Sequence, residues 1–216
     1  MSGNAAFPMR IADYIESFET RFPFLASDVL PWDITSRLPS VIEEIAATIR
    51  PALYKSDGGI MIHEGATVES GATLKAPLII GEGCYVAATA YLRGGVFLDR
   101  GVTVGPGCEV KASLIMADCV LAHFNYVGDS IVGAGVNLEA GAVIANHLNE
   151  REAKEVFVYL GGLAMPTGIT KFGALIGDEV RIGANAVLSP GTVLAPGEVV
   201  GRLELVDQGS PLRRTR

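Results

Sequence analysis

The sequence between residues 62 and 110 divides into blocks of six: IHEGAT, VESGAT, LKAPLI, IGEGCY, VAATAY, LRGGVF, LDRGVT, VGPGCE and the V that opens the next block. Every block opens with Ile, Leu or Val, and the fifth residue is small in most blocks. Chance would produce such a run with a probability on the order of 10⁻⁵ per starting point. After a phase slip between about 111 and 131, the spacing resumes at Val132, Leu138 and Ile144, and it resumes once more at 176–200.

A period of six fits neither an amphipathic strand nor a helix, whose periods are 2.0 and 3.6 residues. It fits a coil of short strands joined by turns, in which each block contributes one inward aliphatic side chain and one small one. Glycines in segments such as ESGA and GPGC fall where turns need a permissive backbone. We therefore predict an all-β fold, a single-stranded left-handed parallel β-helix of hexapeptide repeats with a short N-terminal helical segment.

Three segments are expected. Residues 1–55 lack the period and should form a helical cap, with a capping box at 40–43 (SVIE) opening one helix and a second helix at 11–18. This cap is expected to cover the first coil, because terminal repeats expose apolar faces; a docking surface for another protein is the alternative. Residues 56–202 should form the β-helix, with an extruded loop at 148–170, and residues 203–216 a C-terminal tail.

Composition restricts the partners. The net charge of −7 argues against nucleic acid, because phosphate backbones bind basic surfaces. The N-terminus MSGNAAFPMR has no apolar signal region, and the chain has no uncharged apolar run long enough to span a membrane. The three cysteines show no CxxC spacing, so no metal site is expected from them. We expect a cytoplasmic protein without nucleic-acid or membrane partners.

Polar residues concentrate where the repeat is interrupted. The segment LAHFNYVGDS at 121–130 and the residues after it supply them: His123, Asn125, Tyr126, Asp129, Asn137, Asn146 and His147. Buried polar groups are costly without partners, so their density needs a reason. Spacing alone leaves two readings open, a functional site or a side-chain ladder that only satisfies turns.

Several of these residues match a known family. Residues 80–200 resemble the C-terminal acetyltransferase domain of the bifunctional bacterial enzymes that acetylate glucosamine-1-phosphate and then make UDP-N-acetylglucosamine. The matching motifs stand at the family's spacings: Leu92-Arg93, Val110-Lys111, His123-x-x-Tyr126-x-Gly128-Asp129, Val136-Asn137-x-x-Ala140-Gly141, Asn146 and Lys171-Phe172-x-x-x-Ile176-Gly177-Asp178.

The resemblance implies an acetyl-CoA-dependent N-acyltransferase that acts on a phosphorylated amino sugar or a nucleotide sugar, with acetyl-CoA as co-substrate and no metal. The family's general base falls on His123. Its substrate-binding residues fall on Arg93, Lys111 and Tyr126 for the phosphate and on Asn137, Asn146 and Lys171 for the sugar. Its cofactor-binding residues fall on Ala140, Asn146, His147 and Ala184. Enzymes of this kind place each site between neighbouring subunits, which implies a homotrimer.

This chemistry is reasonable on general grounds. An amine that attacks a thioester must lose a proton, and imidazole is a suitable acceptor near neutral pH. The attack also creates an oxyanion, for which a backbone N–H near Ala140 is a candidate donor.

The sequence departs from the family at several points. His147 replaces a tyrosine, and Glu139 replaces a small residue and puts a charge near the expected thioester. The insertion before Lys171 is longer, the hexads stop soon after Val200, and no Gly-rich nucleotide-binding segment precedes the coil. These departures leave acyl transfer as the expectation but put the acceptor sugar in doubt.

Two other functions compete. A non-catalytic sugar-nucleotide-binding or scaffold β-helix is favoured by Glu139 and disfavoured by His123, because pure binding needs no base. A zinc enzyme of the β-helix carbonic anhydrase type would need three converging imidazoles. His63 lies more than one coil from His123, which argues against that site.

Arg93 and Lys111 are separated by three hexads, which should equal one turn of a three-sided coil. The two cations should then stand on adjacent coils about 4.8 Å apart. Their repulsion, ~1 kcal/mol at high dielectric, would be relieved by a phosphate that Arg can hold bidentately. The alternative is a solvated face on which Glu109 neutralises Lys111 and Asp99 neutralises Arg93.

Overall fold

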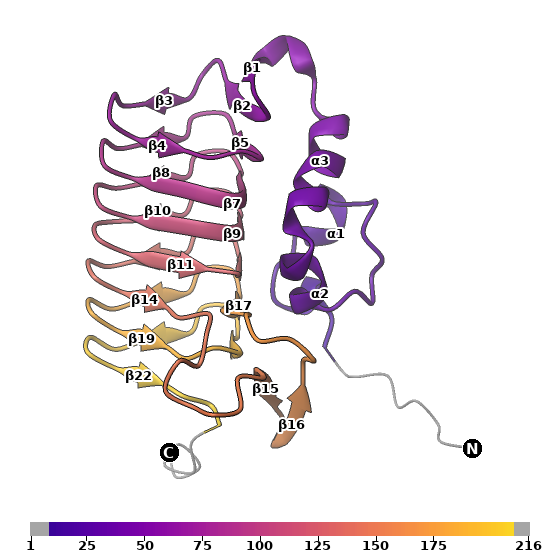
Figure 1. The fold of residues 1–216 in the computed structure, drawn as a ribbon, viewed down its shortest axis with the longest axis vertical. Helices are drawn as coiled ribbons and strands as arrows, with labels where there is room; N and C mark the ends of the chain where they lie inside the picture. The colour runs from indigo at the N-terminus through magenta and orange to yellow at the C-terminus, as the bar shows by residue number, and fades with distance from the viewer. Residues whose placement is uncertain (1–8, 210–216) are drawn as a thin grey trace.

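The computed structural model describes residues 9–209 and shows a left-handed parallel β-helix with helices along one side (Figure 1). The predicted fold is confirmed. Short strands stack coil upon coil into three flat faces, and the block-opening side chains, such as Ile80, Val86 and Leu92, fill a fully buried interior. Face 1 consists of β2 (Ile60–His63), β5 (Leu78–Ile80), the second halves of β7 (Tyr91–Leu98) and β9 (Glu109–Ile115), β12 (Ile131–Val132), β17 (Ala174–Ile176) and β20 (Thr192–Leu194).

The other two faces follow the same parallel register. Face 2 consists of β3 (Thr67–Val68), β6 (Tyr85–Val86), β8 (Thr103–Val104), β10 (Val120–Leu121), β13 (Asn137–Leu138), β18 (Arg181–Ile182) and β21 (Val199–Val200). Face 3 consists of β4 (Thr73–Leu74), the first halves of β7 and β9, β11 (Tyr126–Gly128), β14 (Val143–Ile144), β19 (Val187–Leu188) and β22 (Leu205–Val206). An antiparallel strand β1 (Tyr54–Asp57) pairs with β2 at the N-terminal end.

The phase slip of the hexads has a structural cause at the corner between faces 3 and 1. Leu98 pairs with Ile115, and Ile115 pairs with Val132, so each of these coils is one residue shorter than the 18-residue coil that joins Leu92 to Val110. The missing residue lies at this corner, where Ala112 stands in place of Gly94-Gly95.

Serine hydroxyls complete the shortened corners. Ser113 Oγ donates to the Lys111 carbonyl (2.8 Å) and accepts the Ser130 N–H (3.1 Å). Ser130 Oγ donates to the Gly128 carbonyl (2.7 Å) and accepts the Ala174 N–H (3.0 Å). Backbone groups that the missing residue would have paired therefore find partners within the corner.

The N-terminal helical segment lies along face 1 rather than over the end of the first coil, so the expected cap is wrong in its position (Figure 1). It comprises 3₁₀ turns at Ile11–Asp13 and Pro51–Leu53, and helices α1 (Phe18–Arg21), α2 (Pro31–Ser36) and α3 (Leu38–Thr48). The reason is that the outward side chains of face 1 are apolar and need cover: Ile79, Phe97, Leu114, Ile131, Leu175 and Val193.

The expected capping box at 40–43 is also wrong. Helix α3 begins at Leu38, with Pro39 in its first turn, so Ser40 lies inside the helix. Proline fits the first turn because its missing N–H would have no helical partner there. The helix expected at 11–18 is a 3₁₀ turn followed by α1, which begins only at Phe18.

Two other boundaries differ from expectation. The excursion expected at 148–170 contains an antiparallel hairpin, β15 (Phe157–Leu160) and β16 (Leu163–Pro166). The β-helix continues past residue 202 to β22, because Leu205 and Val206 pair with Val187 and Leu188 on the preceding coil. The remainder of the expected tail, 210–216, lies outside the described residues. Within the described part of the chain, no helix is long and apolar enough to cross a bilayer.

We predict that Phe97→Ala costs about 3–5 kcal/mol of unfolding free energy, because Phe97 is fully buried under the helices although it points out of the coil. Urea unfolding followed by circular dichroism measures it. The control is Tyr85→Ala, an outward aromatic on uncovered face 2 that is 37% exposed and should cost less than about 1.5 kcal/mol. Equal costs for the two would mean that the helices do not stabilise face 1.

Candidate functional site

Arg93 and Lys111 stack as predicted. They are register partners on β7 and β9, at the corner where face 3 turns into face 1, and Lys111 pairs in the same way with Gly128 of β11. We call this column the cation corner; it comprises residues 93–95, 111–113, 128–130 and 146. The corners at 111–113 and 128–130 are equally short, so their residues stay in register from one coil to the next.

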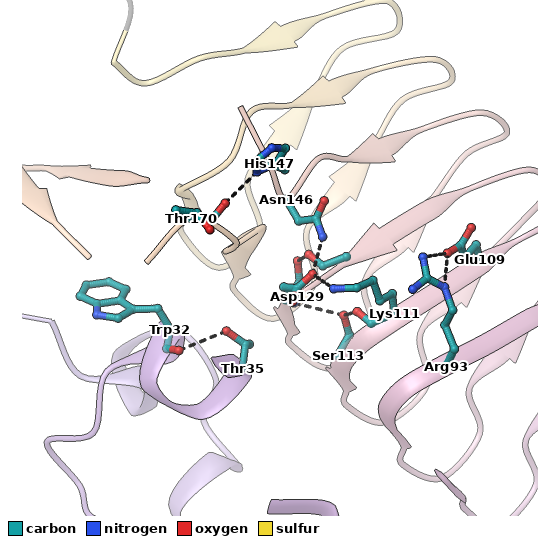
Figure 2. Close-up of polar contacts among 12 residues, drawn as sticks. Trp32, Thr35, Arg93, Glu109, Lys111, Ser113, Asp129, Asn146, His147 and Thr170 are labelled. Carbon is teal, nitrogen blue, oxygen red and sulfur yellow. Dashed lines mark hydrogen bonds and ion pairs between the residues drawn. The ribbon is translucent and has the colours of Figure 1, made fainter. Parts of the chain in front are cut away.

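Arg93 and Lys111 each have a carboxylate partner within the chain (Figure 2). Lys111 Nζ lies 2.5 Å from Asp129, whose carboxylate also accepts a hydrogen bond from Asn146 Nδ2. Arg93 Nε donates to Glu109 Oε1 (2.8 Å), and Arg93 Nη2 lies 2.6 Å from the same oxygen. Asp129 is only 7% exposed, so Lys111 and Asp129 form a largely buried ion pair.

Carboxylates therefore neutralise Arg93 and Lys111, as in the alternative prediction from the sequence, but the ion pairs are not the ones expected. Glu109 pairs with Arg93 rather than Lys111, because the two side chains are diagonal neighbours on face 3. Asp99 lies at another corner and pairs at 3.3 Å with Arg21 of the helical segment.

Tyr126 leans from β11 toward the same corner. It is half-buried, and a Cβ atom at Gly128 would lie 2.7 Å from its hydroxyl, so only glycine leaves room for this orientation. Burial, together with the charges of Asp129 and Glu109, raises the pKa of the Tyr126 phenol. The phenol therefore stays protonated at neutral pH and can donate a hydrogen bond to an anion.

The excursion leaves and rejoins the β-helix beside this corner. Phe172 N–H donates to the Asn146 carbonyl (3.1 Å), and the His147 ring Nδ1 lies 3.0 Å from the Thr170 carbonyl. These two contacts join the residues at which the excursion begins and ends, which we call its neck. They put the backbone of the exposed Lys171 next to the cation corner.

Trp32 of α2 packs edge-on against Phe172, with ring centroids 5.7 Å apart. The helical segment therefore supports the neck of the excursion as well as face 1, and Figure 2 shows Trp32 on the α2 side of the neck. Sequence reasoning missed this role because a lone tryptophan far from the motifs gives no signal of what it contacts.

A second column occupies the corner between faces 2 and 3, which we call the base corner. His123, Ala140, Ala184 and Arg202 take equivalent positions on successive coils. The stacking is fixed by Gly141 N–H to the His123 carbonyl (2.9 Å), Asn185 N–H to the Ala140 carbonyl (3.0 Å) and Leu203 N–H to the Ala184 carbonyl (3.0 Å).

His123 is exposed at this corner. The Ala140 N–H, one coil away, donates to no group among residues 9–209 and is free to meet a developing oxyanion.

The carboxylate of Glu139 is paired at this corner. Its carboxylate accepts from Arg202 Nε (2.8 Å) and Nη2 (2.9 Å) and from the Ala184 N–H (2.9 Å). The Arg202 hydrogen bonds, followed by the Ala184 N–H, lower the pKa of Glu139 to about 2. Beside this pair, Asn137 and Arg181 line a shallow depression of about 280 Å³ on face 2.

The structure thus separates the predicted site residues. Arg93, Lys111, Tyr126, Asn146 and Lys171 gather at the cation corner, and His147 lies there too rather than with Ala140 and Ala184. His123, Ala140 and Ala184 form the base corner, and Asn137 lies on face 2. The sequence named both sets but gave no sign that a whole face lies between them.

The histidines do not converge. His63 packs edge-on against Tyr54 and accepts the Gly65 N–H, His123 stands at the base corner, and His147 lies at the neck. Among residues 9–209, no group of three or more His, Cys, Asp or Glu side chains could hold a metal ion.

Comparisons with known proteins bear on this site. The chain is 37% identical over 137 residues to a bifunctional sugar-1-phosphate nucleotidylyltransferase/acetyltransferase from Sulfurisphaera tokodaii, covering 63% of this chain and 34% of that protein. It is 32% identical over 182 residues to a bifunctional protein GlmU from Methanococcus vannielii, covering 82% of this chain and 43% of that protein. A solved hexapeptide transferase family protein from Anaplasma phagocytophilum is 18% identical, with a TM-score of 0.40, and covers 68% of this chain and 74% of that chain.

The chain spans less than half the length of these two curated relatives. A family model described as the GMPPB C-terminal domain matches residues 85–204, which hold both the cation corner and the base corner. This match covers more than half of the chain. The chain belongs to the GMPPB C-terminal domain family.

Proposed function

We propose that the chain is an acetyl-CoA-dependent N-acyltransferase that acts on a phosphorylated amino sugar as a cytoplasmic homotrimer. The observation that carries the proposal is the cation corner, where Arg93 stacks on Lys111 near a protonated Tyr126 and Phe172, which follows Lys171, is hydrogen-bonded to Asn146. The similarity to the bifunctional sugar-1-phosphate nucleotidylyltransferase/acetyltransferase supports the same class.

The charge balance of the cation corner suits a phosphate. Glu109 and Asp129 balance Arg93 and Lys111 there, and the exposed Lys171, at the end of the excursion, adds one positive charge in excess. Arg93 uses only one oxygen of Glu109, and its outer edge remains available for a second acceptor. A phosphate can add to this arrangement through Arg93, Lys171 and the Tyr126 hydroxyl without breaking the buried pair of Lys111 and Asp129.

The base corner supplies the groups that acyl transfer requires. The amine nitrogen of the acceptor attacks the thioester carbonyl, and His123 takes the proton that the nitrogen loses. The carbonyl oxygen becomes an oxyanion, which the free Ala140 N–H can stabilise. Collapse of this intermediate breaks the C–S bond and releases the thiol, and the proton held by His123 balances the charge of the leaving sulfur.

A trimer would bring the two corners together. Gly128 follows His123 by five positions along face 3, a span of roughly 16 Å at the rise of an extended chain. The phosphate and amine of an amino sugar phosphate are much closer to each other than that. We propose that the base corner of one copy faces the cation corner of the next, in a closed cyclic arrangement.

A non-catalytic binding protein remains the second candidate, and one observation favours it. Glu139 and Arg202 lie across the base corner where the acyl donor would run. A binding protein would keep the cation corner and need no access for a thioester.

We predict that His123→Ala lowers turnover by about two to four orders of magnitude, because the general base is lost. Thiol release from acetyl-CoA measures turnover, and isothermal titration measures acetyl-CoA affinity, which should stay close to that of the wild type. The matched variant is His147→Ala, which changes the other candidate histidine. Unchanged turnover in His123→Ala combined with lost turnover in His147→Ala would assign the base to His147.

We expect Arg93→Ala to raise the KM for glucosamine-1-phosphate at least about tenfold while the KM for acetyl-CoA stays unchanged, because a charged hydrogen bond to phosphate is lost. Steady-state kinetics with both substrates tests this. Arg100→Ala serves as the control, since Arg100 forms an exposed pair with Asp118 at another corner. If Arg93→Ala used glucosamine-1-phosphate and glucosamine as the wild type does, the phosphate assignment would be wrong.

Mixed assemblies test the shared site. His123→Ala chains and Arg93→Ala/Lys171→Ala chains, each with little activity alone at glucosamine-1-phosphate concentrations below the wild-type KM, should regain activity when they are unfolded together and refolded, because some interfaces then join two intact corners. A mixture that stays as inactive as its components would place both corners of a working site on one chain. Light scattering showing a monomer at micromolar concentration would contradict the trimer itself.

A further inference from the structure

The base corner is a column of stacked residues along the axis of the β-helix, and we call its strip from His123 to Arg202 the trough. From His123 to Arg202 the column crosses three coil spacings, a length of about 14 Å. The two residues between them, Ala140 and Ala184, carry the smallest side chain that a non-glycine residue can have. A linear ligand can therefore lie along the column with its reacting end at His123.

Glu139 and Arg202 close this trough. The Glu139 carboxylate reaches one coil along to take the Ala184 N–H at 2.9 Å, so the backbone donor on the trough floor is occupied. Arg202 reaches back from the next coil and holds the same carboxylate through two nitrogens. A ligand that hydrogen-bonds to Ala184 must first displace Glu139.

The contact between a glutamate and a corner N–H also has a structural use elsewhere. Glu69 occupies the position equivalent to Glu139 four coils earlier, and its carboxylate accepts the Ala88 N–H at 2.7 Å. Its other oxygen takes the Tyr85 hydroxyl instead of an arginine. Glu69 therefore shows what a purely structural version of this contact looks like, and it lies away from His123.

The pair at Glu139 is easily opened. The side chains of Arg202 and Glu139 are 74% and 41% exposed, and solvated ion pairs of this kind are weak. Opening it also leaves no buried group without a partner, because both side chains can turn into water.

We infer that Glu139 and Arg202 form a removable cover over the acyl-donor trough, and that they set the affinity for a thioester carrying a linear amide chain, such as the pantetheine arm of acetyl-CoA. Once Glu139 swings away, an amide carbonyl of that chain accepts the Ala184 N–H in its place. This inference rests on the proposed function, since it assumes that the base corner receives the donor.

The test measures acetyl-CoA binding by isothermal titration to the full chain, with folding checked by circular dichroism. Glu139→Ala removes the competing carboxylate and should tighten binding about 3- to 10-fold. Arg202→Ala, which frees Glu139 but leaves it near Ala184, should tighten binding by less. Glu69→Ala removes the same contact away from the trough and should leave the affinity unchanged.

Two results would overturn the inference that Glu139 and Arg202 cover the trough. If the wild type binds acetyl-CoA and Glu139→Ala binds it equally or more weakly, Glu139 is not a competitor, while the proposed function stands. If Glu69→Ala tightens binding as much as Glu139→Ala, the effect is a general loosening of the coil. An absence of binding in the wild type and in both cover variants would overturn the inference and the acyl-donor assignment together.

Discussion

The in-register hydrogen bonding between successive coils is the constraint on which the rest of the structure depends. Parallel strands about 4.8 Å apart fix every residue above its equivalent on the previous coil. Arg93 therefore stands next to Lys111, and His123 stands next to Ala140, although each pair is separated along the chain by a full coil. A change of one residue in coil length would misalign every column beyond it, so the shortened corners at Ala112 and Asp129 need the compensation that Ser113 and Ser130 provide.

Stacking also brings charged side chains close together at the corners, and ion pairs within the chain neutralise them there. A column of equivalent positions brings like charges together, and low solvent exposure strengthens their repulsion. At the cation corner, Asp129 neutralises Lys111 and Glu109 neutralises Arg93, while Lys171 enters from the excursion without a carboxylate among the residues described here. At the base corner, Arg202 neutralises Glu139. These pairs leave a small positive excess at the cation corner and an exposed ion pair at the base corner.

The sequence was sufficient for the fold and for the stacking of Arg93 on Lys111, because a six-residue period and an 18-residue separation translate directly into geometry. It was not sufficient for partners that arrive from elsewhere in the chain. The position of the helical segment depends on the outward residues of face 1, such as Phe97, and hexad counting treats those positions as solvent-facing. The pairing of Asp129 with Lys111, rather than Glu109 with Lys111, depends on a shortened corner that appears in the sequence only as a loss of phase.

The central claim is that the two corners together transfer an acyl group to a phosphorylated amine. The most direct measurement is the initial rate of thiol release from acetyl-CoA by the wild-type protein, with glucosamine-1-phosphate and with glucosamine as acceptors. The account predicts release that depends on the acceptor, saturates with glucosamine-1-phosphate and is at least about tenfold slower with glucosamine at the same concentration. No release above the rate without protein, combined with measurable binding of glucosamine-1-phosphate, would contradict it and identify a binding protein instead.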